Sequence, residues 1–314
     1  MNIKKVFFQN KNSKPLYYLK AELRRLFAAH VPTRRKHLLK QLAQYNLDDI
    51  MSRVHYYNQL QEHRPLLDSP VRISENVRPA RLKVYYYDSQ EYLRYFDGHL
   101  QFQLIPGDVT TIPHSPSLVK SRPIAGDIAN AVLLNLDKVR HFNFIQDDIP
   151  FAAKKDMLIG RAAVQQEHRR RFYELYFHHP LCDLGDIMKD SPWLKPKISI
   201  AEHLNYKFIL AIEGNDVATN LKWIMSSNSI AVMPEPTYET WYMEGRLQPD
   251  VHYISIRKDY ADLEEKLAYY MAHPEKAQEI IDQANAYTRQ FRDQTKEDLI
   301  SVLVLEKYFE YTNN

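Results

Sequence analysis

The stretch that decides the fold is residues 205–256, which read NYKFILAIEGNDVATNLKWIMSSNSIAVMPEPTYETWYMEGRLQPDVHYISI. Three apolar runs in it are expected to be strands: 206–213, 229–234 and 251–256. Helical patterns alternate with these runs: 217–227, 238–243 and 259–271. This β-α-β-α-β-α order predicts parallel strands with right-handed crossovers, as in a nucleotide-binding half of a doubly wound fold.

Outside this stretch the pattern is also mixed. The first 65 residues are expected to be helical, because Leu19, Leu23 and Leu26 recur at helical spacing. Further strands are expected at 81–87, 100–105, 141–145 and 156–159, and further helices at 165–177 and 274–313. The sequence therefore predicts an α/β protein with a helical N-terminal region. We expect two domains, 1–150 and 151–314.

Composition excludes several classes of protein. The chain has 314 residues, 45% of them hydrophobic and 26% charged, which is typical of a globular protein with a buried core. The single cysteine, Cys182, excludes a disulfide framework and a multi-cysteine metal site. The 13 histidines lack zinc-ligand spacing, so a zinc site is not expected. The sequence has no run of about 18 apolar residues and no secretory signal, so we expect a cytoplasmic protein.

Charge is unevenly distributed along the chain. Residues 1–83 contain 17 Lys or Arg and 6 Asp or Glu, a net charge of +11, whereas the whole chain carries +3. Such a segment attracts anionic partners: phospholipid headgroups, a phosphorylated glycan or nucleic acid. A solvated helix face explains the same composition. The sequence contains no recognised nucleic-acid-binding module.

The turn after residues 206–213 is a candidate anion site. Gly214 is followed by Asn215 and Asp216 and then by the helical pattern from Val217, with Lys222 further along. Amides at the start of a helix favour a phosphate group. The alternative is an ordinary helix capped by Asn215 or Asp216, which local sequence alone favours.

A second candidate is the basic segment after residues 156–159. Arg161 and Ala162 lie in the strand-end turn, and Arg169 begins a run of three arginines on the next helix. Arginine binds diphosphate oxygens in a fork geometry. The alternative is a solvated basic helix face, because three successive arginines cannot all face one ligand.

Two sets of carboxylates follow strands. Asp108, in the segment PGDVTT, is placed to act as a general base, although a turn aspartate bonded to its own backbone is the commoner arrangement. Asp147 and Asp148 suggest a divalent-metal site, but adjacent side chains point in different directions, so we discount them. Cys182 lacks a thiolate-activating neighbourhood and is expected to be structural.

Taken together, these segments resemble glycosyltransferase family 90. The run YKFILAIEGN, LKWIMSSNS, YETWY, VHYI and DYADL, between residues 206 and 263, follows the family pattern at the right intervals. Weaker matches extend from about residue 100 to 270: PGD at 106–108, LVKSRP at 118–123, RHF at 140–142 and IGRA at 159–162.

The resemblance implies a GT-B architecture, two Rossmann-like lobes with a central cleft, and inverting, metal-independent transfer from a UDP-sugar. By position, Asp108 resembles the general base and Arg169 the donor-phosphate arginine, with Arg161 and Ala162 beside it. The remaining donor-binding positions that the resemblance implies are Gly214, Asn215, Asp216, Val217, Ala218, Asn220, Lys222 and Glu239. Asn220 stands where many members carry arginine, and Gly160-Arg161 departs from the usual Trp-Arg-Gly-Ala turn.

The resemblance therefore implies a UDP-sugar-dependent hexosyltransferase acting on a bacterial surface glycan such as lipopolysaccharide core. No cofactor is expected, and the expected partners are the donor and a glycan or glycolipid acceptor, without nucleic acid. The basic first quarter of the chain suggests a peripheral contact with the anionic inner-membrane surface. The alternative is an inactive nucleotide-sugar-binding protein, because Asn220 lacks the usual charge.

Overall fold

A computed structural model describes residues 12–27 and 32–313, which form two compact units. Among these, unit 1 consists of residues 12–13, 139–236 and 246–290, and unit 2 of residues 14–138, 237–245 and 291–313. These boundaries differ from the expected division at residue 150. They differ because two later segments, 237–245 and 291–313, fold with the elements of the first 138 residues.

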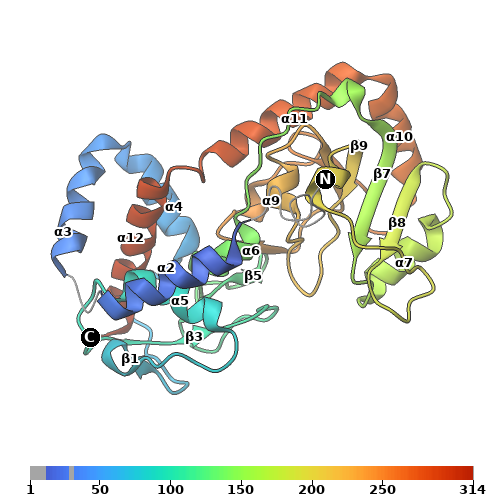
Figure 1. Ribbon diagram of the computed structural model, residues 1–314. Coiled ribbons are helices and arrows are strands. Elements are labelled where there is room, and N and C mark those ends of the chain that lie inside the picture. Colours follow the sequence, from blue (N-terminus) through green and yellow to red (C-terminus); the bar gives the residue numbers. More distant parts are fainter. Residues whose placement is uncertain (1–11, 28–31, 314) are drawn as a thin grey trace. The chain divides into compact units, whose positions relative to one another are not determined.

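Unit 1 is built around a five-stranded sheet in the order β12-β10-β9-β7-β8. Three of these strands, β9, β7 and β8, are labelled in Figure 1. Its strands are β7 (Lys155–Ala162), β8 (Cys182–Asp186), β9 (Tyr206–Leu210), β10 (Ile230–Met233) and β12 (Ile254–Ser255). All neighbouring pairs are parallel. The parallel sheet predicted from the apolar runs is therefore confirmed, and with it the α/β class.

Helices and single turns connect or follow these strands. They are η3 (Phe151–Ala153), α7 (Glu167–Tyr176), α8 (Ile200–His203), α9 (Leu221–Ile224), α10 (Leu263–Ala272) and α11 (Pro274–Arg289). The core is continuous from the strands to α7, α10 and α11, and includes Phe208, Phe172, Leu267 and Ile280. Strands buried on both faces read as unbroken apolar runs, which is why this sheet is visible in the sequence.

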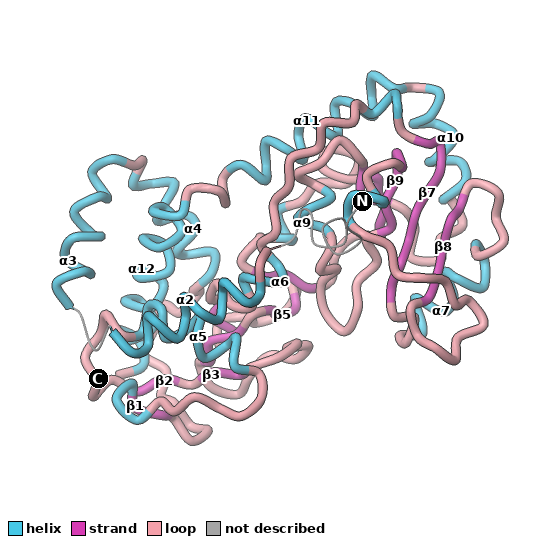
Figure 2. Tube along the Cα trace, viewed as in Figure 1, coloured by secondary structure: helices cyan, strands magenta, loops and turns pink. Residues whose placement is uncertain are grey.

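Unit 2 combines helices with three small sheets (Figure 2). Its helices are α2 (Lys14–Phe27), α3 (Pro32–Lys40), η1 (Gln41–Gln44), α4 (Leu47–Tyr57), η2 (Ile73–Glu75), α5 (Lys83–Leu93) and α12 (Gln294–Thr312). Its strands are β1 (Val71–Arg72), β2 (Gln101–Phe102), β3 (Leu104–Ile105), β4 (Ser117–Val119), β5 (Ser121–Pro123), β6 (Ala131–Leu133) and β11 (Tyr238–Thr240). The helical N-terminal region is confirmed where it is described; residues 1–11 and 28–31 lie outside the described residues.

Two expected strands are wrong. Residues 83–93 form α5, in which Tyr85, Tyr86 and Tyr87 are all buried, so the run of tyrosines reflects a helix packed on several sides rather than alternation. The expected strand at 141–145 is instead the end of α6 (Lys138–His141) and a loop. In this loop the Ile145 amide donates to a side chain, Ser226 Oγ, at 3.0 Å rather than to a neighbouring strand.

Two expected helices also differ. Residues 238–240 form β11, which pairs antiparallel with β5, a partner more than 100 residues away that no local pattern reveals. The helix expected at 217–227 shortens to α9, because residues 214–217 bend and the Gly214 amide donates to the Asp216 carbonyl oxygen at 2.8 Å. The chain between η4 (Glu244–Arg246) and β12 then returns to unit 1. Among the described residues, no helix has both the length and the apolarity to span a bilayer.

Candidate active site

Arg169 lies at the carboxyl edge of the parallel sheet, in the first turn of α7. Its Nε and Nη2 donate to the carbonyl oxygens of Glu213 and Ile212, both at 2.8 Å, and its Nη1 donates to the carbonyl oxygen of Ala163 at 3.0 Å. These carbonyls follow β9 and β7, which are neighbours in the sheet. The guanidinium therefore spans two strand ends, where ligands bind in open α/β sheets.

The charge of Arg169 is not balanced by a carboxylate in contact with it. All three hydrogen-bond partners are neutral carbonyls, and within the described residues Arg169 forms no ion pair. Burial lowers its pKa from the usual value, yet a guanidinium remains protonated in proteins. A partly buried cation of this kind is suited to an anionic ligand such as a diphosphate.

Gly214 follows the carbonyls that Arg169 holds. A Cβ at this position would lie 3.3 Å from Arg169 Nη2, a tight contact that requires the guanidinium to shift by a few tenths of an ångström. The turn is tied to α7 a second time, because Gln166 Nε2 donates to Asn215 Oδ1 at 2.9 Å. The turn at Gly214 is therefore in close contact with Arg169 and α7.

The amides from Gly214 to Ala218 do not belong to a helix. Residues 214–217 form a bend, and α9 begins only at Leu221 and has four residues. The helix-dipole part of the sequence argument is therefore wrong for this segment. Asp216, Val217 and Ala218 are buried, and the role of these five residues in donor binding stays a prediction.

Asn220 and Lys222 are both inward-facing. Asn220 Nδ2 donates to the carbonyl oxygen of Leu210, the last residue of β9, at 2.9 Å. Lys222 is fully buried, with no exposed surface. Asn220 thus links the segment after the bend to the sheet edge. The asparagine that replaces the arginine of many family members therefore has a structural role in this chain.

Arg161, at the end of β7, contrasts with Arg169. Its Nη2 donates to Asp183 Oδ1 at 2.8 Å, and its Nη1 donates to the Asp183 carbonyl oxygen at 2.6 Å. Although burial raises the pKa of Asp183, hydrogen bonds from Lys195, Arg161 and Tyr206 outweigh it and lower the pKa to about 2. Arg161 is therefore already neutralised, whereas Arg169 is not. Ala162, beside it, is half-buried.

Asp108 belongs to unit 2 and lies in the loop after β3. Gly107 has a φ of 102°, a conformation that favours glycine, so the Pro-Gly turn sets the direction in which Asp108 leaves the strand. Lys120 Nζ donates to Asp108 Oδ1 at 2.5 Å. The lysine side chain is 1% exposed and the aspartate side chain is 29% exposed. A buried ammonium thus holds a carboxylate that remains accessible to a substrate.

Glu239 also belongs to unit 2, on β11. Its Oε1 accepts from Arg122 Nε at 2.8 Å, and its Oε2 accepts from the Tyr56 hydroxyl. Both side chains of the ion pair are buried, and burial raises the pKa of Glu239. Gly245 leaves room for this cluster, because a Cβ there would lie 2.8 Å from the Tyr56 hydroxyl oxygen. The contacts of Glu239 are those of a structural ion pair, and its donor-binding role stays a prediction.

Comparison with known proteins identifies the family. The model of glycosyl transferase family 90 matches residues 147–308. O-glucosyltransferase LpsA of Dichelobacter nodosus is 48% identical over 263 residues, which is 83% of this chain and 82% of that protein. The chain belongs to glycosyl transferase family 90. It is therefore a glycosyltransferase, which uses a sugar donor and an acceptor.

Eukaryotic relatives match a shorter part of this glycosyltransferase. Protein O-glucosyltransferase 2 of Danio rerio is 31% identical over 106 residues, 33% of this chain and 19% of that protein. Protein O-glucosyltransferase 3 of Rattus norvegicus is 27% identical over 110 residues, 35% of this chain and 21% of that protein. Asp108 lies outside the region that the family model matches, whereas Arg161, Arg169 and Gly214 lie inside it.

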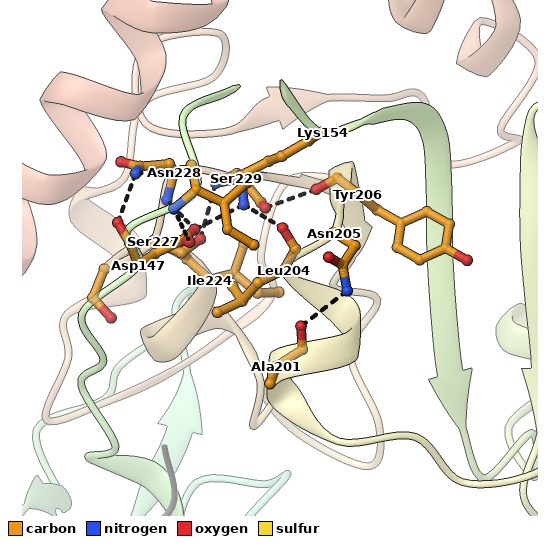
Figure 3. Close-up of polar contacts among 12 residues, drawn as sticks. Asp147, Lys154, Ala201, Leu204, Asn205, Tyr206, Ile224, Ser227, Asn228 and Ser229 are labelled. Atoms are coloured by element: carbon orange, nitrogen blue, oxygen red, sulfur yellow. Dashed lines mark hydrogen bonds and ion pairs between the residues drawn. The ribbon is translucent and has the colours of Figure 1, made fainter. Parts of the chain in front are cut away.

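Asp147, the discounted metal ligand, has a structural role in this glycosyltransferase (Figure 3). Its Oδ2 accepts from Lys154 Nζ at 2.8 Å and from the Asn228 amide at 2.9 Å, and Asn228 Nδ2 donates to its carbonyl oxygen at 2.8 Å. Both members of the Asp147–Lys154 pair are buried. Across the described residues, no group of three or more His, Cys, Asp or Glu side chains is placed to hold a metal ion.

Two site residues were not predicted from the sequence. Lys120 and Arg122 hold Asp108 and Glu239, respectively, and both lie in the LVKSRP segment at 118–123 that carried part of the family resemblance. This segment is where the sequence indicates them. It is short and partly apolar, and basic residues that are buried in such a segment need carboxylate partners. What the sequence lacks is the identity of those partners.

Proposed function

We propose that this glycosyltransferase transfers a hexose, with glucose as the first candidate, from a UDP-sugar to a bacterial surface glycan such as lipopolysaccharide or lipooligosaccharide core. The observation that carries the proposal is the charge of Arg169, a partly buried cation that forms no ion pair with any described residue and lies at the carboxyl edge of a parallel sheet. The 48% identity to an O-glucosyltransferase supports glucose.

The donor side of the reaction requires a stabilised leaving group. As the anomeric bond breaks, negative charge develops on the UDP diphosphate, and Arg169 is the group that this chain offers to it. A preorganised donor at such a position is worth roughly 3–4 kcal/mol in the transition state. In this proposal the backbone amides of residues 214–218 supplement Arg169.

The acceptor side requires a base. We assign this role to Asp108, whose carboxylate is partly exposed and is paired with the Lys120 ammonium. Attraction to the ammonium stabilises the charged carboxylate, which is the form that accepts a proton from the acceptor hydroxyl as that oxygen attacks the anomeric carbon. One base without a covalent nucleophile gives inversion at that carbon.

The remaining parts of the proposal follow from the family resemblance. They are a GT-B architecture and catalysis without a metal. In such a mechanism fixed cationic groups replace the metal that a carboxylate pair would hold. Action in the cytoplasm is also part of the proposal. Contact with the anionic inner-membrane surface is motivated by the basic N-terminal segment and is separable from catalysis.

A donor screen tests the proposal. Purified protein is incubated with UDP-glucose, UDP-galactose or UDP-xylose, with and without a lipooligosaccharide core acceptor, and released UDP is measured. We expect release that depends on acceptor, is highest with UDP-glucose, and persists in EDTA. The proton NMR spectrum of the product should show a β-linkage, since the donor is α-linked. Donor binding without UDP release would instead support an inactive nucleotide-sugar-binding protein.

A further inference from the structure

Helix α2 packs on the rest of unit 2 through the face that carries Ala21 and Tyr17. Ala21 is buried against Tyr86 and Tyr87 of α5, and Tyr17 packs against the same cluster. The Tyr17 hydroxyl donates to Asp88 Oδ1 at 2.7 Å. The inner face of α2 is therefore defined by Tyr17 and Ala21 rather than by its leucines.

The leucines of α2 lie on the outer side. Leucines at positions 16, 19, 23 and 26 recur at the spacing of one helix face, within an arc of roughly 80° at about 100° per residue. All four are exposed: Leu16 49%, Leu19 57%, Leu23 45% and Leu26 64%. A helix of a globular protein normally turns its leucine stripe toward the core. This outward stripe, the leucine face, is the reverse of that arrangement.

The sequence segment that carries the leucine face is basic. Residues 14–40 contain eight Lys or Arg and one acidic residue, Glu22. Arg24 and Arg25 form ion pairs with Glu91 and Glu22. Four lysines of this segment are exposed and, among the described residues, form no ion pair: Lys14 and Lys20 on α2, and Lys36 and Lys40 on α3. Their charge remains available to an external anion.

We infer that α2 lies on an anionic lipid surface, with the leucine face at the boundary between headgroups and acyl chains and the lysines against lipid phosphates. Charge complementarity selects this occupant, because two copies of a segment carrying +7 repel each other. Nucleic acid would use the lysines but leave the leucines in water. The inference deepens the proposed function, on which it rests for the choice of a membrane-borne acceptor.

Vesicle flotation tests the leucine face directly. The full chain is mixed with vesicles of phosphatidylcholine alone or of phosphatidylcholine and phosphatidylglycerol in equal parts, without substrate. We expect binding to the anionic vesicles only. In the double variant Leu19→Glu/Leu23→Glu, the affinity for anionic vesicles should fall by at least about tenfold. Two apolar side chains no longer enter the lipid, and the two added carboxylates are repelled by the negative headgroups. The matched control is Leu67→Glu/Leu194→Glu, which changes leucines that are 66% and 52% exposed elsewhere and should bind as the original chain does.

A second variant isolates the charge. Replacing Lys14, Lys20, Lys36 and Lys40 by glutamine should remove the preference for phosphatidylglycerol and the sensitivity of binding to salt. Circular dichroism should give unchanged melting for all variants, because every altered side chain is exposed.

Three results would overturn the inference: full vesicle binding by the leucine variant, equal binding to both vesicle types, or a leucine-dependent dimer in light scattering without vesicle binding. UDP release is measured separately on a detergent-free, delipidated core acceptor. Vesicle binding without UDP release overturns the proposed function alone, and UDP release without vesicle binding overturns this inference alone.

Discussion

Two ion pairs of unit 2 use the same chemistry in different surroundings. In the closed pair, Arg53 and Glu297 are 1% and 4% exposed, and Trp241 Nε1 donates to Glu297 Oε2 at 2.6 Å. In the open pair, Lys120 is equally buried but Asp108 is 29% exposed. Both cations are in the interior, so the difference lies in the carboxylate. The closed pair fastens α4 to α12, whereas the open pair presents a charged oxygen to solvent, as a base requires.

The largest expected effect comes from the open pair. Asp108→Asn keeps the shape of the side chain but removes its ability to accept a proton, so kcat should fall by about 10²–10⁴. The melting temperature and UDP binding should remain close to those of the original chain. UDP release in the presence of acceptor measures kcat, and calorimetry measures the melting temperature and UDP binding. Turnover within a few fold of the original would show that another group is the base.

Breaking the closed pair should lower folding stability and leave catalysis largely unchanged. Arg53→Met leaves Glu297 buried without its cation, which typically costs about 3–5 kcal/mol of folding stability. Activity per folded molecule should be retained below the lowered melting temperature. Urea unfolding measures the loss, and Arg53→Met/Glu297→Gln is the control, since removing both charges should recover part of it. An Arg53→Met protein as stable as the original would mean that the two pairs do not differ as described.

Arg161 and Arg169, at the sheet edge of unit 1, offer a similar comparison: Arg161 is paired with a carboxylate, whereas Arg169 contacts only carbonyl oxygens among the described residues. Arg169→Ala should lower kcat/KM for the donor by about 10²–10³, because the proposed partner of the diphosphate is lost. Arg161→Ala is the matched control: Arg161 is already paired with Asp183, so its removal should affect stability more than donor use. Equal losses of kcat/KM in both variants would remove the distinction between a paired and an unpaired arginine.

How far the sequence predicts the molecule differs between the two units. The sheet of unit 1 was predictable because its strands are buried on both faces and separated by turn residues, as in 206–210 and 230–233. In unit 2 the tyrosine run of α5 resembles a strand, and β11 exists only through its pairing with β5. Local patterns carry no information about such distant partners.

The same limit applies to the site. Arg169 and Asp108 were identified as candidates from strand ends and the family resemblance. The sequence did not indicate that Arg161 is paired with Asp183 or that Lys120 holds Asp108. Both pairings depend on strand register: Arg161 and Asp183 lie on neighbouring strands, and Lys120 follows β4, whose register with β3 brings it to the loop that carries Asp108.

The smallest expected effect separates positioning from stability within the open pair. Lys120→Met removes the buried ammonium that holds Asp108 Oδ1. Because water can still solvate the carboxylate, which is 29% exposed, the stability cost should be smaller than the about 3–5 kcal/mol expected for Arg53→Met. Because the base is then less well oriented, kcat should fall by about tenfold while the donor KM stays within about twofold. Lys120→Arg should restore most of the activity, since it returns a cation to the same site. Two results would make Lys120 a structural residue and the open pair a second closed pair. One is a loss of stability as large as that of Arg53→Met, and the other is a Lys120→Arg protein that is no more active than Lys120→Met.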